Sequence, residues 1–305
     1  MYKRFKHFIS SLSLRMTSTS LYTIGGCPFR LAGSALEEAV AAMPGFQPFR
    51  TEKAPSEMFR IQYVTRQDIP PARKILYRFS TEGISSTLSA SDSGYVLHMN
   101  QEDGAQLYLW GDADGQLLQL QGELCPQLLR FALWIAYGLG TATHGRIAVH
   151  SSCIVHDDRA YLFLGESGTG KSTHTRLWRE HIAGSLLLND DSPILAVETD
   201  GIWIYGSPWS GKTPCYQAKR YRLGGCVRLS QAPYNRMERL SVFQAYAALH
   251  PSCPPQFACD ETLYNGISES LNAVLGSIPV YRLACRPDAE AARLSYQTLC
   301  GRAEL

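Results

Sequence analysis

Hydrophobic and polar positions alternate in short runs through the first part of the chain, from about Leu21 to Leu120. Phe59 to Val64 and Tyr95 to Met99 are two such runs, and a period of two residues is typical of a strand with one buried face. Turn signals separate the runs as in an antiparallel meander; they are Asp92-Ser93-Gly94, Glu102-Asp103-Gly104 and residues 112–115. The pattern therefore predicts a strand-rich region that one helix, near Ala35 to Met43, interrupts.

The pattern changes after Cys125, where Pro126 opens an apolar stretch that predicts a helix through Leu139. Strands are predicted at Arg146 to Val155 and at Ala160 to Leu164, so helices and strands alternate in the second half. We expect an α/β fold, α+β overall, in three parts. These are an N-terminal extension at 1–20, a strand-rich domain at 21–125 and an α/β domain at 126–305.

Composition and charge argue against several classes of protein. The 305 residues are 45% hydrophobic and 18% charged, as in ordinary globular proteins. The formal net charge of +2 gives no general attraction to nucleic acid. The most apolar helical stretch, Leu128 to Leu139, is about a dozen residues long and too short to span a bilayer. We expect neither a nucleic-acid partner nor a membrane, and leave a homo-oligomer open.

The nine cysteines are odd in number and show no zinc-ligand spacing, which favours reduced thiols. Residues Met1 to Arg15 resemble a poor signal peptide, because serines break the apolar run and no small-residue cleavage site follows. Met16 is an alternative start. The interpretation is a cytoplasmic protein.

One segment carries a strong signal for phosphate binding. Gly165-Glu166-Ser167-Gly168-Thr169-Gly170-Lys171-Ser172 fits G-x-x-x-x-G-K-[ST] and lies between an apolar strand and a predicted helix from Ser172 to Ala183. Glycines let successive backbone N–H groups face phosphate oxygens at a helix N-terminus. Lys171 is then expected at the β- and γ-phosphates and Ser172 at Mg²⁺, with Thr173 completing the nucleotide-binding set. An ordinary Gly-rich turn is the alternative.

A second stretch, Gly206 to Thr213, satisfies the same expression. Pro208 lacks an N–H, Trp209 is bulky where the backbone must approach phosphate, and Pro214 disfavours a following helix. A second nucleotide loop is therefore not expected. The residues Ser207, Ser210 and Lys212 are instead candidates to face the transferred phosphate, the alternative being a plain surface turn.

An acidic pair follows the phosphate loop. A short predicted strand, Ser185 to Leu188, is expected beside the loop's own strand and delivers Asn189-Asp190-Asp191 at its end, where ligands of open α/β sheets gather. Two adjacent carboxylates there suit a division of labour between binding Mg²⁺ and accepting a proton. An acidic turn is the alternative, and His150, on the predicted strand before the loop strand, is by itself more typical of a structural histidine.

The segments Val149-His150-Ser151-Ser152, Gly165 to Ser172 and Leu188-Asn189-Asp190-Asp191, in this order, resemble the catalytic core of HPr kinase/phosphorylase, a family grouped with the phosphoenolpyruvate carboxykinases. The similarity covers about residues 145–215. It implies that Asp190 accepts a proton, that Asp191 binds metal and that His150 lies close to the catalytic aspartate.

The chain departs from that family after the acidic pair, where residues 206–212 replace an Arg-Gly-Leu-Gly-like signature. This points away from HPr as acceptor and toward divergent relatives, some of which phosphorylate serine in peptides or as the free amino acid. The expected function is a Mg²⁺-dependent kinase that transfers phosphate from ATP, or another nucleotide, to a hydroxyl acceptor. A non-catalytic nucleotide sensor and a phosphoenolpyruvate-carboxykinase-type reaction are the alternatives.

Overall fold

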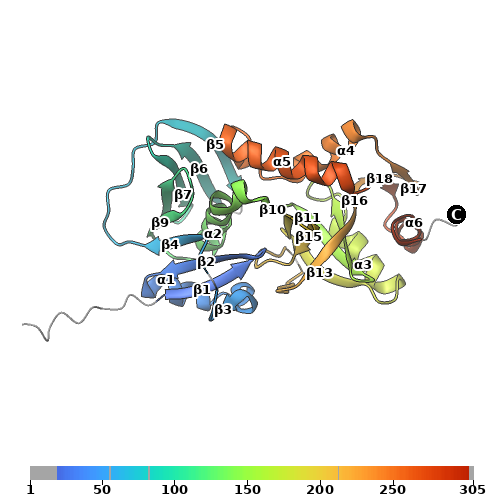
Figure 1. Cartoon of the computed structure of the whole chain (residues 1–305), viewed down its shortest axis with the longest axis horizontal. Coiled ribbons are helices and arrows are strands. Elements are labelled where there is room, and N and C mark those ends of the chain that lie inside the picture. The colour runs from blue at the N-terminus through green and yellow to red at the C-terminus, as the bar shows by residue number, and fades with distance from the viewer. Residues whose placement is uncertain (1–18, 55, 82, 212, 302–305) are drawn as a thin grey trace, which may run out of the picture.

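The structure is a computed structural model that describes residues 19–54, 56–81, 83–211 and 213–301. The segment Met1 to Arg15 and Lys212 lie outside these ranges. Figure 1 shows a mixed α and β architecture. The described residues form two large sheets, each of nine strands. The expected α+β class is thus confirmed. Within the described ranges, no helix combines the length and apolarity needed to cross a bilayer.

The first sheet has the strand order β3-β1-β2-β4-β9-β8-β7-β6-β5. Its strands are β1 (Thr19–Ile24), β2 (Cys27–Ala32), β3 (Arg50–Thr51), β4 (Phe59–Tyr63), β5 (Lys74–Thr81), β6 (Ile84–Ala90), β7 (Gly94–Gln101), β8 (Gln106–Asp112) and β9 (Leu117–Gly122). Strands β5 to β9 form the predicted antiparallel meander. Strand β4 pairs in parallel with β2 and with β9, which joins the meander to the N-terminal hairpin. The predicted helix is α1 (Ser34–Ala41), followed by the 3-10 helix η1 (Pro44–Phe49).

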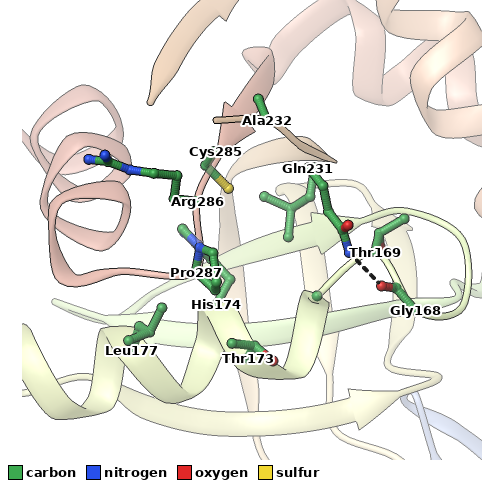
Figure 2. A pocket seen from close by; sticks show the side chains of 12 residues that line it. Gly168, Thr169, Thr173, His174, Leu177, Gln231, Ala232, Cys285, Arg286 and Pro287 are labelled. Carbon is green, nitrogen blue, oxygen red and sulfur yellow. Dashed lines mark hydrogen bonds between the residues drawn. The ribbon is translucent and has the colours of Figure 1, made fainter. Parts of the chain in front are cut away.

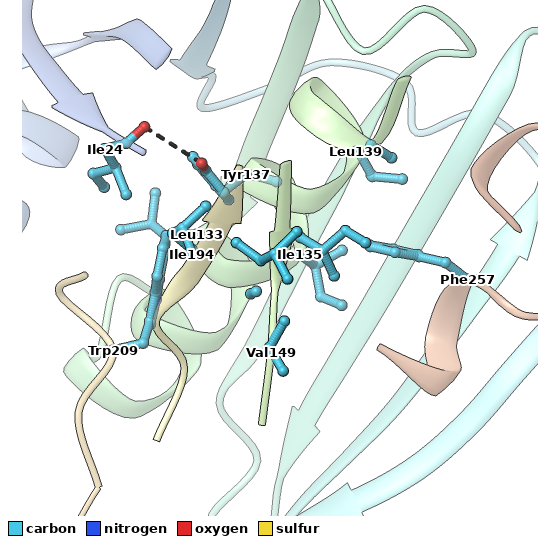
Figure 3. Close-up of a cluster of buried hydrophobic side chains, with 14 of the residues drawn as sticks. Ile24, Leu133, Ile135, Tyr137, Leu139, Val149, Ile194, Trp209 and Phe257 are labelled. Atoms are coloured by element: carbon cyan, nitrogen blue, oxygen red, sulfur yellow. Dashed lines mark hydrogen bonds between the residues drawn. The ribbon is translucent and has the colours of Figure 1, made fainter. Parts of the chain in front are cut away.

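Helix α2 (Pro126–Thr141) connects the two halves of the molecule. It contacts β7 and β8 of the first sheet and β10 of the second. Figure 3 shows side chains of α2 meeting residues from β1, β14 and two loops, and the Tyr137 hydroxyl donates to the Ile24 carbonyl over 3.3 Å. One hydrophobic core cluster runs through both sheets and α2. Glycines on α2 permit this packing, because a methyl group at Gly140 would overlap the Phe59 ring.

The second sheet has the strand order β10-β14-β15-β16-β12-β11-β13, with β18 paired to β16 and β17. Its strands are β10 (Arg146–Ala148), β11 (Ser151–His156), β12 (Arg159–Leu164), β13 (Leu186–Asp191), β14 (Ile194–Glu198), β15 (Gly201–Tyr205), β16 (Arg220–Gln231), β17 (Arg236–Arg239) and β18 (Val280–Cys285). Its helices are η2 (Ala142–His144), α3 (Lys171–His181), α4 (Val242–Leu249), η3 (His250–Ser252), η4 (Pro255–Phe257), α5 (Glu261–Ser277) and α6 (Ala289–Cys300).

Two predictions about this sheet are wrong. The strand expected over Arg146 to Val155 is two strands, because the His150 backbone N–H donates to the Ser252 carbonyl rather than to a neighbouring strand. Strand β10 then pairs with β14, whereas β11 pairs with β12 and β13. The acidic strand β13 is also not beside the loop strand β12, since β11 runs antiparallel between them. Strands β12 and β13 therefore run in the same direction and end at the same edge of the sheet.

Candidate functional site

The predicted phosphate loop has the expected structural context. Strand β12 ends at Leu164 and α3 begins at Lys171. Gly168 and Gly170 have φ angles of 85° and 102°, which side chains with a Cβ rarely adopt. A methyl group at either position would meet no atom within 4 Å. These two glycines are therefore required by backbone conformation, and the space in front of them is open.

Lys171 lies at the centre of the site. Its ammonium donates to the carbonyls of Gly165 and Glu166, over 2.8 and 3.1 Å, and lies 3.0 Å from His150 Nε2. A lysine ammonium has three donors, so all three are used. Burial lowers the pKa of Lys171, and the Asp191 carboxylate opposes that shift. A phosphate oxygen can replace one carbonyl without leaving the ammonium unpaired.

His150 links this lysine to the acidic pair. Because its Nε2 accepts from Lys171, the neutral ring carries its proton on Nδ1. Nδ1 lies 3.2 Å from Asp191 Oδ1, so the N–H donates to the carboxylate. The other oxygen, Asp191 Oδ2, is 4.0 Å from a guanidinium nitrogen of Arg130 on α2. Lys171, His150 and Asp191 thus form one hydrogen-bonded chain.

Asp190 has a different environment. It is 6% exposed, and Ser152 on β11 donates to its Oδ1 over 2.7 Å. The Ser152 hydroxyl is also 2.9 Å from that of Thr175, in the second turn of α3. Asp190 Oδ2 is buried without a hydrogen-bond partner. A buried carboxylate oxygen in this state costs free energy, so it marks a place for a cation or a water.

The second Gly-rich stretch is held against the acidic strand. Buried Asn189 donates from Nδ2 to the carbonyls of Ser207 and Trp209, and its Oδ1 accepts from the backbone of Asp191 and Ser192. Ser207 is fully buried and donates to the Ser192 carbonyl over 2.6 Å. The prediction that Ser207 faces the transferred phosphate is therefore wrong, since its buried hydroxyl holds the turn together. No helix begins within the described part of 206–219.

The predicted site residues largely come together around one cavity of about 610 Å³. Its lining is Arg130, His150, Ser167, Gly168, Gly170, Lys171, Ser172, Thr173, Asp190, Asp191, Ser210 and Gly211. The acidic pair thus faces the phosphate loop. Of the other predicted residues, Gly165 is buried at the base of the loop. Glu166 is exposed, and its Oε1 lies 3.5 Å from a guanidinium nitrogen of Arg228. No local pattern marks Arg130 as a site residue, because α2 reaches the site only through the fold.

A second cavity of about 610 Å³ lies on the other side of the loop. Figure 2 shows Thr173, His174 and Leu177 of α3 along one side of it, with Gln231 and the Cys285-Arg286-Pro287 segment across from them. Gln231 donates to the Gly168 carbonyl over 3.1 Å, which fixes the loop to the end of β16. Thr169 lines this cavity, and Gly168, Gly170 and Thr173 line both.

The residues present fit a Mg²⁺ ion. Within the described ranges, no group of three or more His, Cys, Asp or Glu side chains is arranged to hold a metal. Mg²⁺ in nucleotide enzymes needs no such group, because one or two protein oxygens and the substrate phosphates bind it. The unpaired Asp190 Oδ2 and the exposed Ser172, which lines the same cavity, supply that kind of donor.

No protein-family model matches this chain, and no curated protein matches it either.

Proposed function

We propose that this protein is a Mg²⁺-dependent kinase that transfers the terminal phosphate of a nucleotide to a hydroxyl acceptor. One observation carries the proposal: a single cavity joins the glycine loop and Lys171 to two carboxylates and a histidine. Phosphoryl transfer needs little beyond positioning, neutralisation of charge and a proton acceptor, and these groups supply all three. We further propose that residues 126–301 form a P-loop domain of the phosphoenolpyruvate-carboxykinase type, on the resemblance noted above.

The cavity of Figure 2 favours a nucleotide over pyrophosphate as donor. It opens from the same loop glycines, and Leu177, Leu229 and Pro287 give it apolar walls. A volume of about 610 Å³ is in the range of small-molecule sites. In this proposal it takes the base and sugar, while the triphosphate extends across the loop toward Lys171.

The contacts favour a division of roles opposite to the one that the resemblance implies. Asp190 is connected through Ser152 and Thr175 to α3, and its free oxygen suits Mg²⁺. When bound, Mg²⁺ neutralises charge on the phosphate oxygens. Asp191 is oriented by the His150 Nδ1–H and lines a neighbouring cavity as well. Asp191 thus accepts the acceptor's proton as the β–γ bridging P–O bond breaks and a new P–O bond forms.

The test is transfer from γ-labelled ATP with Mg²⁺ to a panel of free serine, serine peptides and HPr. Lys171→Met is expected to lose nucleotide binding and transfer. Asp191→Asn is expected to keep nucleotide binding but lose transfer at least about a hundredfold, the usual contribution of a general base. Asp190→Asn should instead raise the Mg²⁺ concentration that half-saturates the reaction.

The exposed Asp68 gives a matched control, since Asp68→Asn removes a carboxylate remote from the site. Unchanged transfer by Asp191→Asn would overturn its assignment as the base. A loss of transfer confined to Asp190→Asn would favour Asp190 as the base, as the resemblance implies. ATP binding without transfer to any acceptor in a cell extract would favour a nucleotide sensor. Formation of phosphoenolpyruvate from oxaloacetate would favour the carboxykinase reaction.

A further inference from the structure

Strand β17 is an open edge of the second sheet. Among the described strands it pairs only with β18, and Figure 1 shows it at the end of the molecule away from the first sheet. The Leu240 N–H donates to the Val280 carbonyl over 2.9 Å, and these two residues continue the β17–β18 register. Because bonding positions alternate along an antiparallel pair, the N–H and C=O groups of Met237 and Arg239 point away from β18.

Exposed apolar side chains lie at both ends of this edge. Three of the six exposed large apolar side chains in the described ranges are Tyr234, Val242 and Phe243, which are 56%, 68% and 84% exposed. Tyr234 comes just before β17, and Val242 and Phe243 begin α4 just after it. Single exposed apolar residues need no explanation, but apolar groups gathered along one open edge mark an interaction surface.

The charges on β17 indicate which partner fits this surface. The Glu238 carboxylate lies 3.5 Å from the guanidinium of Arg236 and 3.6 Å from that of Arg282, so both pairs are loose. In an antiparallel pair of two β17 strands with a twofold axis at Met237, Arg236 of each copy faces Glu238 of the other. Their Cα atoms would be about 4.5 Å apart, and opposite charges there stabilise the pair. An axis half a residue further along sets Arg236 opposite Arg239, which is unfavourable.

The same axis matches the apolar ends. Met237 packs in the hydrophobic cluster under α6, whereas α4 packs in the cluster on the other face of the sheet. A twofold axis through a continuous sheet keeps α4 of both copies on one face. Tyr234 of each copy is then directed toward Val242 and Phe243 of the other, at both ends of the pair. The edge is therefore complementary to itself, as a twofold interface requires.

We propose that two copies of this chain associate through β17, paired antiparallel about a twofold axis at Met237. The outward backbone groups of Met237 bond to those of the second copy, and those of Arg239 bond to Asn235. This inference does not depend on the kinase function. Asn235 also donates to Asp288 over 3.0 Å and accepts from the Arg286 N–H over 2.8 Å, so the interface adjoins a wall of the cavity in Figure 2.

The first test measures the mass of the full chain by light scattering over a wide range of concentration, and a dimer is expected. Arg239→Pro removes an outward N–H that does not bond to β18, and prolines are tolerated on edge strands. This variant and Phe243→Ser are each expected to raise the dimer Kd at least about tenfold. Leu186→Ser, which replaces an apolar residue 57% exposed on β13, is the matched control and should leave the Kd unchanged.

The second test reads the register directly by disulfide formation. Arg236→Cys and Glu238→Cys are purified separately, each with the exposed Cys259 replaced by serine, and then mixed with oxidised glutathione. A Cα separation of about 4.5 Å permits a disulfide, so the mixture is expected to give a covalent dimer that neither variant gives alone. A mixture of Arg236→Cys with Arg239→Cys should not react.

Several results would overturn this inference. A monomer at every concentration would do so, as would a dimer whose Kd changes in neither Arg239→Pro nor Phe243→Ser. Reaction of Arg236→Cys with Arg239→Cys in place of Glu238→Cys would overturn the axis at Met237. A monomer that binds an extended peptide of alternating glutamate and valine, and loses this binding in Arg239→Pro, would assign the edge to an acidic partner instead of a second copy.

Discussion

Asn189 is the residue whose replacement tests the construction of the site most directly. Its side chain is fully buried and connects the acidic strand to the second Gly-rich turn. Nδ2 lies 3.2–3.3 Å from two oxygens of Ser207 and from the Trp209 carbonyl, and Oδ1 lies 2.9–3.0 Å from the backbone nitrogens of Ser192 and Asp191. Asn189→Ala removes all of these contacts at once.

The expected loss of unfolding free energy follows from those bonds. The amide has two N–H donors and one oxygen acceptor, so at most four of the contacts are fully effective, and each contributes about 1 kcal/mol net. Part is retained, because the Ser192 N–H also contacts the Trp209 carbonyl and Ser207 still donates to Ser192. We expect Asn189→Ala to lose about 3 kcal/mol in urea denaturation, with an unchanged m value.

The same replacement should lower phosphoryl transfer, because the Asp190-Asp191 backbone loses its anchor. Displacement of catalytic groups by about 1 Å costs up to roughly a hundredfold in rate, and we expect a fall of at least about tenfold. Asn265→Ala, on the exposed face of α5, is the control. A loss below about 1 kcal/mol together with wild-type kinetics would refute the view that Asn189 organises the site.

Three further predictions follow from burial and backbone conformation. Burial lowers the pKa of His174 to about 4, whereas an unfolded histidine titrates near 6.5. The free energy of unfolding should therefore fall by up to about 3 kcal/mol as the pH drops from about 6.5 to 4, and His174 should contribute no change above that range. Urea denaturation across this range should show a flatter decline in His174→Gln, and equal slopes would contradict the assignment. Gly170→Ala should lower the free energy of unfolding by about 1–2 kcal/mol, because the φ of Gly170 is 102°. Gly276→Ala, in α5 with open space around it, should raise it by about 0.5–1 kcal/mol. Shifts of Tm in the same direction for both variants would argue against this reasoning. Cys259 is exposed, while burial raises the pKa of Cys226 to about 12, so a thiol reagent followed by peptide mass spectrometry should label Cys259 first, and equal labelling of the native protein would count against the packing.

Local sequence predicted the phosphate loop well because the information lies within a few consecutive residues. The glycines, Lys171 and the flanking strand and helix depend only on neighbours in the chain, and the structure has them in the expected arrangement. The facing of Asp190 and Asp191 toward the loop was also predictable, since strands that run in the same direction end at the same edge of a sheet.

The rest of the site depends on sheet order, which periodicity does not encode. Nothing in the alternation of apolar residues indicates that β11 lies between β12 and β13, and this insertion is what brings Ser152 to Asp190. Arg130 and Ser252 lie 20 residues before and 102 residues after His150 in the sequence, and they meet it only in the fold. In the same way, the meander β5 to β9 was predictable from local turns, whereas the parallel pairing of β4 with β2 and β9 was not.

Helix α2 packs against the first sheet, yet it also supplies Arg130 and Trp134 to the walls beside the acidic pair. A hybrid protein that kept this chain only from residue 142 onward would inherit the complete Gly165–Ser172 motif, but it would lose the Arg130 and Trp134 walls of the cavities in front of it. Under the proposed kinase function, substitutions on α2 should therefore change which molecule is modified, without any substitution in the Gly165–Ser172 loop.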